Sequence, residues 1–179
     1  MSSTIGVQNI AHTNGTNAMT IGSDGGVSMT GHVLQVKHFQ TGAVDTTTTI
    51  LPKDDSIPQN TEGKEFMSLA ITPTNVNSDL IIETELNLDT TVTNYMTVAL
   101  FQDDNVNALS AAYIHMSGVQ HTKRIHLKFK MEAGTTSETT FKVRAGLAAA
   151  ATVTLNGTNS SRFYGGVCNS YMQITEIGG

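Results

Sequence analysis

Several residue types that would point to particular chemistry are scarce in this sequence. It contains one cysteine, Cys168, so no disulfide can form within the chain, and a zinc site built from several cysteines is excluded. It has no tryptophan and few aromatic residues, which weighs against a stand-alone module that stacks sugars on an aromatic platform. Charged residues make up only 14% of the chain, against about 25% in an average globular protein.

The charge balance and the spacing of apolar residues exclude further classes. A net charge of -5 does not supply the basic field that nucleic-acid binding requires, so we expect no nucleic-acid partner. No apolar run approaches the roughly 20 residues needed to span a bilayer. Residues 1–15 lack the basic and apolar regions of a signal peptide. We therefore expect no membrane insertion, and a protein that stays in the cytosol or leaves it within an assembly.

Alternation of apolar and polar residues is strongest in Ser78–Asp89. Apolar side chains at positions 80, 82, 86 and 88 fall on one face of a strand, with Thr84 between them. Glu83 and Glu85 fall on the other face, because successive side chains of a strand point to opposite sides. One buried face and one wet face are typical of an antiparallel sheet.

The same alternation recurs along the chain, which predicts an all-β fold. Short strands separated by turn signals favour an antiparallel β-sandwich, jelly-roll-like, over residues 32–179. Asn156-Gly157 is a strong hairpin signal. Residues 94–102 are apolar on both faces, which fits the centre of a sandwich or a subunit interface. The further predicted strands are Val33–Phe39, Glu65–Thr72, Asn94–Gln102, Ala108–His115, His121–Glu132, Thr139–Ala145, Ala148–Leu155 and Tyr171–Ile177.

Residues 1–31, called the N-terminal segment below, form a separate unit in this prediction. Turn signals divide the segment into very short strands at Ile5–Ile10, Ala18–Ile21 and Val27–Met29. A single copy has too little apolar surface to fold alone. We expect it to anchor or trimerise the protein, and the alternative is a partly ordered arm. Around a threefold axis the shared core would consist of Ile10, Met19, Ile21, Val27 and Met29.

Two groups of residues have the chemistry of metal ligands. The run from Asp103 to Asn107 supplies oxygen atoms of the kind that Ca²⁺ takes, but it lacks the glycine and distal glutamate of an EF-hand loop. A hairpin turn is the favoured interpretation. The histidines at 115, 121 and 126 are not spaced to converge on one ion. We therefore expect no metal site and no cofactor.

Candidate catalytic groups are few. Glu83 and Glu85 lie on one strand face, and a pair of carboxylates suits glycoside hydrolysis. The basic residues between His121 and Lys130 can lie beside them, and cross-strand pairing is the favoured interpretation. The sequence has no G-x-S-x-G elbow. We expect no catalytic residues and no enzymatic activity.

Two surface features are candidates for contact with a partner. The exposed loop Asn156–Gly166 carries Arg162, Phe163 and Tyr164, and arginine and aromatic residues are frequent binding anchors. The alternative is that these rings tuck under the loop. A row of basic residues has the charge to meet an acidic capsid or an anionic glycan, but a solvated face with salt bridges is favoured. That row consists of Arg124, Lys128, Lys130, Lys142 and Arg144.

Five stretches resemble bacteriophage fibre and virion structural proteins. TNGTNAMTIGSDGGVSMTGHVLQV resembles their N-terminal repeat, which leads into G-x-V-L-Q-V. ITPTNVNSDLIIETELN resembles their S-I-T-P-x-x-x-x-S-K-I-L-I strand pair, with Asp79 where lysine is frequent. YMTVALFQDDN resembles their strand and turn with Gln102 in place of arginine, and TTFKVRAG and YMQITEIGG resemble their later strands. The order of these motifs, which span most of the chain, is more specific than any one of them.

The resemblance implies a phage virion protein, all-β and homotrimeric, with a β-sandwich head and no agreed catalytic residues. We predict a fibre, spike or capsid-decoration subunit, assembled in the host cytoplasm and resident in the virion. Its N-terminal segment would hold it to capsid or tail proteins. Its sandwich would attach to a host surface, for example a glycan, or reinforce the capsid. The alternatives are a stand-alone lectin-like carbohydrate-binding module and a glycan-cleaving enzyme.

Overall fold

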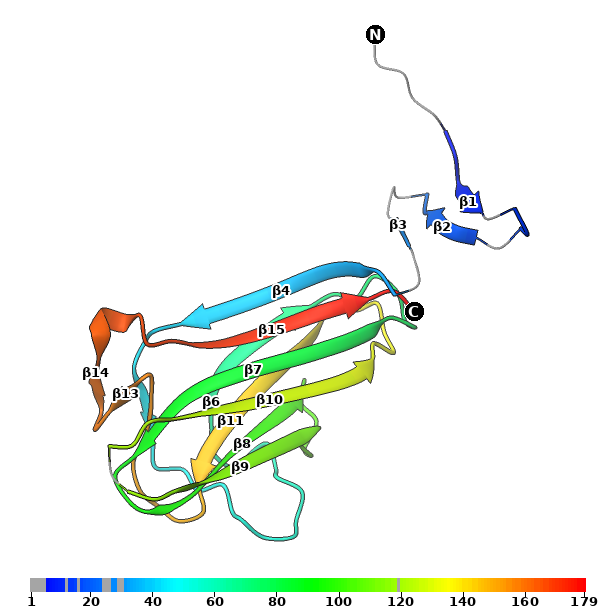
Figure 1. The fold of residues 1–179 in the computed structure, drawn as a ribbon. Coiled ribbons are helices and arrows are strands. Elements are labelled where there is room, and N and C mark those ends of the chain that lie inside the picture. The colour runs from blue at the N-terminus through cyan, green and yellow to red at the C-terminus, as the bar shows by residue number, and fades with distance from the viewer. Residues whose placement is uncertain (1–5, 12, 16, 24–26, 29–30, 119) are drawn as a thin grey trace.

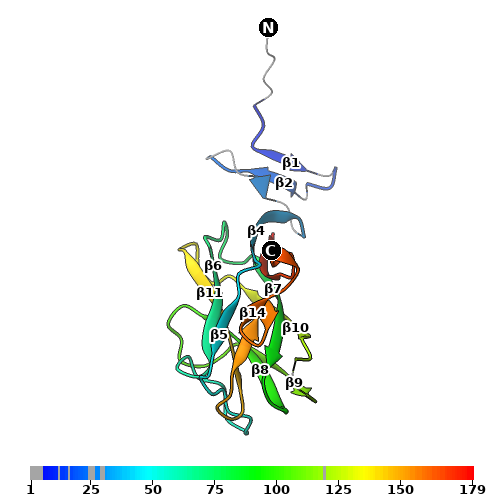
Figure 2. The same cartoon turned by 90° about the vertical axis from the view of Figure 1, so that its left-hand side faces the viewer.

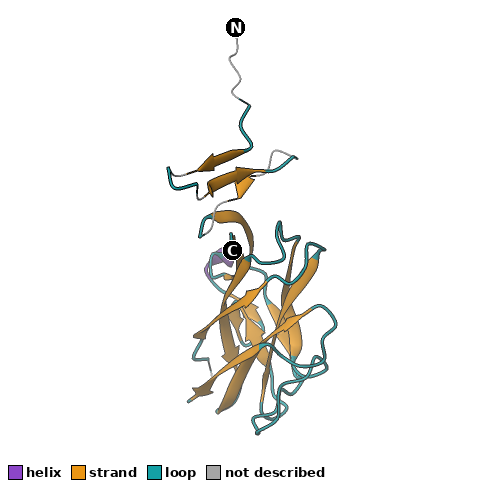
Figure 3. Cartoon of the chain, turned by 90° about the vertical axis from the view of Figure 1, so that its right-hand side faces the viewer, coloured by secondary structure: helices purple, strands orange, loops and turns teal. Residues whose placement is uncertain are grey.

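Two antiparallel sheets face each other in most of the chain, and a small three-stranded sheet lies beyond one end of them (Figure 1). The computed structural model describes residues 6–11, 13–15, 17–23, 27–28, 31–118 and 120–179. In that part of the chain the only helix is a short 3-10 turn, η1 (Tyr164–Gly166). The small sheet stands outside the sandwich in all three views (Figures 1, 2 and 3).

Eight long strands build the sandwich. The first sheet has the order β4 (Val33–Thr41), β15 (Ser170–Ile177), β7 (Asp79–Thr90) and β10 (Lys123–Glu132). Two short strands, β12 (Val153–Leu155) and β5 (Asp45–Thr47), extend it beside the end of β7. The second sheet has the order β6 (Lys64–Ile71), β11 (Thr139–Leu147), β8 (Asn94–Gln102) and β9 (Ser110–Met116).

The pairing of these eight strands is that of a jelly roll. In chain order the first pairs with the eighth, the second with the seventh, the third with the sixth and the fourth with the fifth. A long antiparallel ribbon that folds over itself produces this order, and the two sheets then close over one core. The prediction of an all-β antiparallel sandwich is confirmed.

The predicted buried face of β7 forms the centre of the core. Leu80, Ile82, Leu86 and Leu88 are each fully buried. They belong to one cluster with Val98 and Leu100 of β8 and with Phe141 and Val143 of β11. Each fully buried leucine or isoleucine contributes roughly 1.5–3 kcal/mol of hydrophobic stabilisation.

Strand β8 is apolar on both faces for a reason internal to the chain. Its inner residues Val98 and Leu100 join the main core. On the outer face Ala99 and Phe101 form a second, small cluster with Leu51. Leu51 belongs to the loop between β5 and β6, which crosses the outer face of the second sheet. Of the two interpretations of residues 94–102, the centre of a sandwich is therefore correct, and the outer face of Ala99 and Phe101 is covered without a partner subunit.

A buried carboxylate holds together the end of the sandwich from which the N-terminal segment emerges. Glu176 on β15 is fully buried. Its oxygens accept hydrogen bonds from Gln35 Nε2 at 2.6 Å and from Thr74 N and Oγ1 at 2.8 Å each. Burial alone would raise the pKa of Glu176, but the hydrogen bonds from Gln35 and Thr74 outweigh it and hold the pKa below its ordinary value. One side chain thus connects β15, β4 and the turn after β6.

Truncating Leu86 tests the assignment of the core. Leu86→Ala should lower the free energy of unfolding by about 2–5 kcal/mol, because it leaves a cavity at the centre of the cluster. Lys128→Ala on the neighbouring strand should cost less than about 1 kcal/mol, since that side chain is 56% exposed. Urea unfolding followed by circular dichroism measures both. Equal losses in the two variants would contradict the orientation of β7.

Replacing Glu176 with glutamine tests the buried carboxylate. A folded-state pKa below the ordinary value of 4.5 means that ionised Glu176 stabilises the fold above pH 4.5. This contribution disappears as the pH falls through the folded-state pKa. We expect the native chain to melt at a higher temperature than Glu176→Gln at about pH 7, and the difference to shrink as the pH falls below the ordinary pKa of 4.5. A difference in melting temperature that stays constant over that range would rule out the linkage.

Candidate functional site

The predicted contact loop, Asn156–Gly166, is fixed at its root by one buried asparagine. Asn156 is fully buried and has a φ of 55°, a left-handed conformation that asparagine tolerates better than most residues. Its Nδ2 donates to the carbonyls of Thr41 at 2.8 Å and Ala43 at 3.1 Å. Its Oδ1 accepts from Ser170 Oγ at 2.7 Å. The loop therefore starts from a rigid point beside the end of β4.

The turn of this loop lies three residues beyond its predicted place. β13 (Gly157–Thr158) pairs with β14 (Ser161–Arg162), and the turn residues are Asn159 and Ser160. Their φ values of 51° and 63° are those of a type I′ hairpin turn. The predicted turn at Asn156-Gly157 is wrong, because the Asn156 side chain is engaged in buried hydrogen bonds.

The tip of the contact loop presents aromatic rings to solvent. Tyr164 is 81% exposed and Phe163 is 46% exposed, with ring centroids 6.3 Å apart. Arg162 is also exposed. The alternative in which the rings tuck under the loop is wrong. Tyr164 has a φ of 51°, and backbone strain of this kind costs on the order of 1–2 kcal/mol and is often found at functional sites.

The loop is packed against the chain behind it. The carbonyl of Gly166 approaches Gly42 so closely that any side chain at position 42 would collide with it. Beside the rings lies a hollow of about 260 Å³, whose lining includes Gln120, Thr122 and Cys168. A rigid base and an exposed aromatic tip are the geometry of a preorganised binding loop.

The contact loop and the small sheet lie at opposite ends of the sandwich (Figure 1). β4 leads from the small sheet to Thr41, whose carbonyl is bonded to the root of the loop. Nine residues of strand at roughly 3.3 Å each make this separation about 30 Å. One end of the molecule therefore carries the N-terminal segment, and the other carries the exposed rings.

The small sheet places most of the predicted trimerisation residues in register. It consists of β1 (Asn9–Ala11), β2 (Asn17–Ile21) and β3 (Val27–Ser28). Ile10 lies opposite Met19, and Ile21 lies opposite Val27 in the backbone register. Ile10 is 46% exposed, and Met19 and Ile21 are partly exposed. Met29 lies outside the described residues. The pairing gathers apolar positions on one sheet, and it leaves Ile10, Met19 and Ile21 only partly covered.

The predicted cross-strand ion pairs of the first sheet are present. Lys128 Nζ lies 2.9 Å from Glu83, directly opposite it in the register. Arg124 pairs with Glu85 at 3.1 Å. Lys130 Nζ lies 2.7 Å from the carboxylate of Asp79, the residue that stands where the phage motif frequently has lysine. Asp79 therefore has an ion-pair partner within the chain. Both glutamates are thus held by basic neighbours, as the pairing interpretation predicts.

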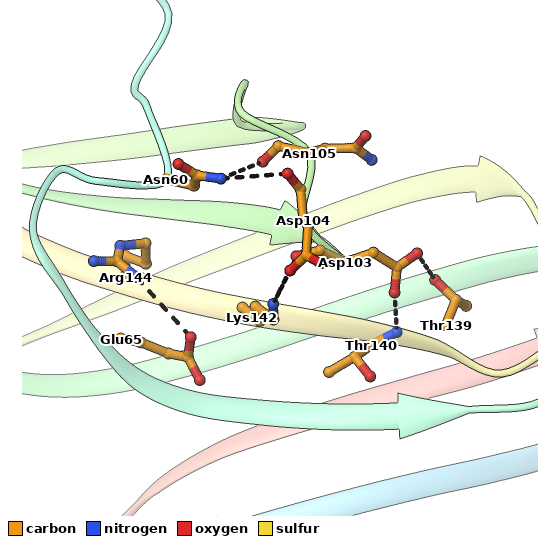
Figure 4. Close-up of polar contacts among 9 residues, drawn as sticks. All are labelled: Asn60, Glu65, Asp103, Asp104, Asn105, Thr139, Thr140, Lys142 and Arg144. Carbon is orange, nitrogen blue, oxygen red and sulfur yellow. Dashed lines mark hydrogen bonds and ion pairs between the residues drawn. The ribbon is translucent and has the colours of Figure 1, made fainter.

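The five basic residues do not form one row. Lys142 and Arg144 lie on β11 in the second sheet, away from the three on β10. Lys142 Nζ donates to the carbonyl of Asp103 at 2.7 Å and lies 3.3 Å from the carboxylate of Asp104 (Figure 4). Arg144 donates to the carbonyls of Glu62 and Gly63. A single basic surface for an anionic partner is therefore wrong.

The acidic turn after β8 is a structural turn. Asp103 Oδ1 accepts from Thr140 N at 2.7 Å, and Oδ2 accepts from Thr139 Oγ1 at 2.8 Å (Figure 4). Asn60 Nδ2 donates to the carbonyl of Asn105 at 3.2 Å. The carboxylate of Asp103 thus binds the start of β11. No group of three or more His, Cys, Asp or Glu side chains among the described residues is placed to hold a metal ion.

A second candidate site was not foreseen from the sequence. On the outer face of β8 and β9, Tyr95 and Tyr113 lie edge to face with ring centroids 6.1 Å apart. Lys53 Nζ sits 4.1 Å from the Tyr95 ring centroid. A groove of about 410 Å³ runs between Tyr113 and the loop that carries Lys53. The sequence places Tyr95 and Tyr113 on two consecutive predicted strands, but only the register of those strands shows that the rings are in contact.

Comparison with known proteins gives weak matches. No family model and no curated protein matches the chain. A sugar-binding protein, the EclA C-terminal domain, is 14% identical with a TM-score of 0.37 over 63% of this chain and 73% of that one. VP2 in an infectious bursal disease virus subviral particle is 9% identical with a TM-score of 0.35, over 84% and 39%. A family 35 carbohydrate binding module from Clostridium thermocellum is 9% identical with a TM-score of 0.35, over 78% and 97%.

These similarities are too low to carry an argument about function.

In the described part of the chain, no helix has the length and apolar character required to cross a membrane.

Two substitutions separate the root of the contact loop from its tip. Asn156→Ala should lower the free energy of unfolding by at least about 2 kcal/mol, because it removes the donor to the carbonyls of Thr41 and Ala43 and leaves the buried hydroxyl of Ser170 without its acceptor. Tyr164→Ala should change it by less than about 0.5 kcal/mol, since the ring is 81% exposed. Thermal and urea unfolding of both variants provide the measurement. A large loss in Tyr164→Ala would mean that the ring is part of the fold and not of a contact surface.

Proposed function

We propose that this chain is a structural subunit of a bacteriophage particle, a fibre, spike or capsid-decoration protein that acts as a homotrimer. Its N-terminal segment assembles the trimer and attaches it to capsid or tail proteins. Its sandwich faces outward, for attachment to a host surface or reinforcement of the capsid. The protein works by binding and not by chemistry.

The observation that carries this proposal is the polarity of the molecule. The N-terminal segment lies at one end and the exposed rings of the contact loop lie at the other (Figure 1). A subunit that must hold a particle and meet a second surface needs its two contacts separated in this way. The resemblance of five motifs to phage virion proteins supports the same function.

The apolar positions of the small sheet support assembly through the N-terminal segment. Ile10 of β1 is 46% exposed, and Val7, which lies just before β1, is 43% exposed, because the small sheet has too little surface to bury them. Copies packed around a threefold axis would cover these side chains with each other. Burial of apolar surface on assembly would then supply the stability that the segment lacks by itself.

Strand β4, which follows the N-terminal segment directly, supports the same arrangement. It is at the edge of its sheet, with β15 as its neighbour. It exposes Val33, Val36 and Phe39 by 48%, 50% and 38%. A long edge strand with exposed apolar side chains is a frequent site of association. A trimer formed by the N-terminal segment would bring three such edges near one another.

Solution mass tests the proposal. Static light scattering of the full chain should give three times the mass of one chain, and a truncated chain that starts at Gly31 should give the mass of one. In the full chain, the double substitution Ile10→Asp with Ile21→Asp should also yield monomers, because three buried copies of each charge repel one another.

A matched control is Ile57→Asp with Val106→Asp, which changes two apolar residues that are 55% and 57% exposed on the sandwich. This variant should remain trimeric. Monomeric full-length protein would overturn the homotrimer. A trimer that survives truncation would move the interface to the sandwich, with the edge of β4 as the first region to mutate.

A further inference from the structure

The groove on the outer face of the second sheet has the size and composition of a small-molecule site. Its volume of about 410 Å³ lies within the range of roughly 300–1,000 Å³ found for such sites. Thr97 of β8 and Ala111 of β9 line it, and both are small. They leave space above the sheet where larger side chains would fill it. Tyr113 and the loop residues Lys53–Ser56 also line it.

An oriented aromatic ring flanks the groove. Tyr113 lies opposite Thr97 in the register and keeps 65% of its surface exposed. Its ring is held edge to face against Tyr95, at an angle of 62°. Tyr95 is in turn held by Lys53 Nζ on one side and by His115 at a centroid distance of 4.9 Å. Lys53 Nζ also lies 5.4 Å from the Tyr113 ring centroid. The Tyr113 ring is therefore held in a fixed orientation while most of the residue stays exposed.

Hydrogen-bonding groups of the loop face the same groove. Asp54 Oδ1 accepts from Ser56 N at 2.8 Å and from Ser56 Oγ at 2.5 Å, so the carboxylate is oriented before any ligand arrives. Asp55 lies next to it on the groove lining. The hydrogen bonds from Ser56 lower the pKa of Asp54, which keeps this carboxylate an acceptor at neutral pH.

We propose that this groove binds a neutral saccharide. A pyranose ring has a face of C–H groups, which pack on the electron-rich face of a tyrosine, and a rim of hydroxyls, which donate to carboxylates. The groove offers these two surfaces side by side, from Tyr113 and from Asp54. Asp54 and Asp55 together outweigh the single positive charge of Lys53 in the lining, so its net negative charge disfavours uronic and sialic acids relative to uncharged sugars.

This site is distinct from the contact loop and from the N-terminal segment, and the proposal does not rest on the proposed function. Saccharide binding would require only a single sandwich and is measured by NMR. Trimer formation is measured separately, by solution mass. A failure of one therefore leaves the other untouched, and each experiment has its own readout.

Saturation-transfer NMR on the full chain tests the proposal. The probes are maltotriose, mannotriose, galactotriose and tri-N-acetylchitotriose, with trigalacturonic acid as the anionic comparison. We expect at least one neutral probe to bind and the anionic probe to give no signal. Tyr113→Ala should weaken binding of that probe by at least about tenfold, as expected for an aromatic anchor. Tyr113→Phe should retain binding, because the ring face is preserved.

A matched control is Tyr171→Ala, which removes a partly exposed tyrosine from the outer face of the other sheet. It should leave saccharide binding unchanged, and thermal unfolding verifies that each variant is folded. The proposal is overturned if none of the neutral probes binds, if Tyr113→Ala binds as well as the native chain, or if trigalacturonic acid binds more tightly than the neutral sugars.

Discussion

The sandwich depends on the requirement that β7 bury one face while both of its edges are hydrogen-bonded. β15 and β10 satisfy the two edges, and the second sheet covers the apolar face. A shift of β7 by one residue in its register would place Glu83 and Glu85 in the core and would turn the buried leucines of β7 toward solvent. The ion pairs with Lys128 and Arg124 stabilise the same register from the solvent side. Apolar burial and charge pairing therefore specify one arrangement.

The jelly-roll pairing brings together segments that are far apart in the sequence. Glu176, in the last motif, accepts hydrogen bonds from Thr74, in the motif that leads into β7. Asp103, which ends the motif of β8, binds Thr139 and Thr140 at the start of the motif of β11. In each case the turn that follows one strand is hydrogen-bonded to a neighbouring strand: the turn after β6 to β15, and the turn after β8 to β11. Each of these turns is thus constrained by a strand that is distant in the sequence.

Local alternation of apolar and polar residues was sufficient to locate nearly every strand. In β7 and β10, for example, this alternation alone identifies the face that is buried. It was not sufficient where a distant neighbour decides. β4 alternates like a half-buried strand, yet it is an edge strand that leaves Val36 and Phe39 exposed. Asn156-Gly157 has the composition of a turn, but contacts with Thr41 and Ala43 make Asn156 a buried root. The pair Tyr95 and Tyr113 follows from register, which composition does not encode.

The absence of tryptophan argues against a platform made by one large ring, but it does not argue against one that the sheet assembles. The register brings Tyr113 beside Tyr95, and a loop adds Lys53 and two carboxylates. A shallow groove with one exposed ring provides few contacts, so a single copy would bind a sugar weakly. If copies are held together on one particle, as proposed, their combined affinity can exceed that of one site by about 10²–10⁴-fold. Under the proposed function, such a groove would belong to a subunit whose binding strength comes from the number of copies.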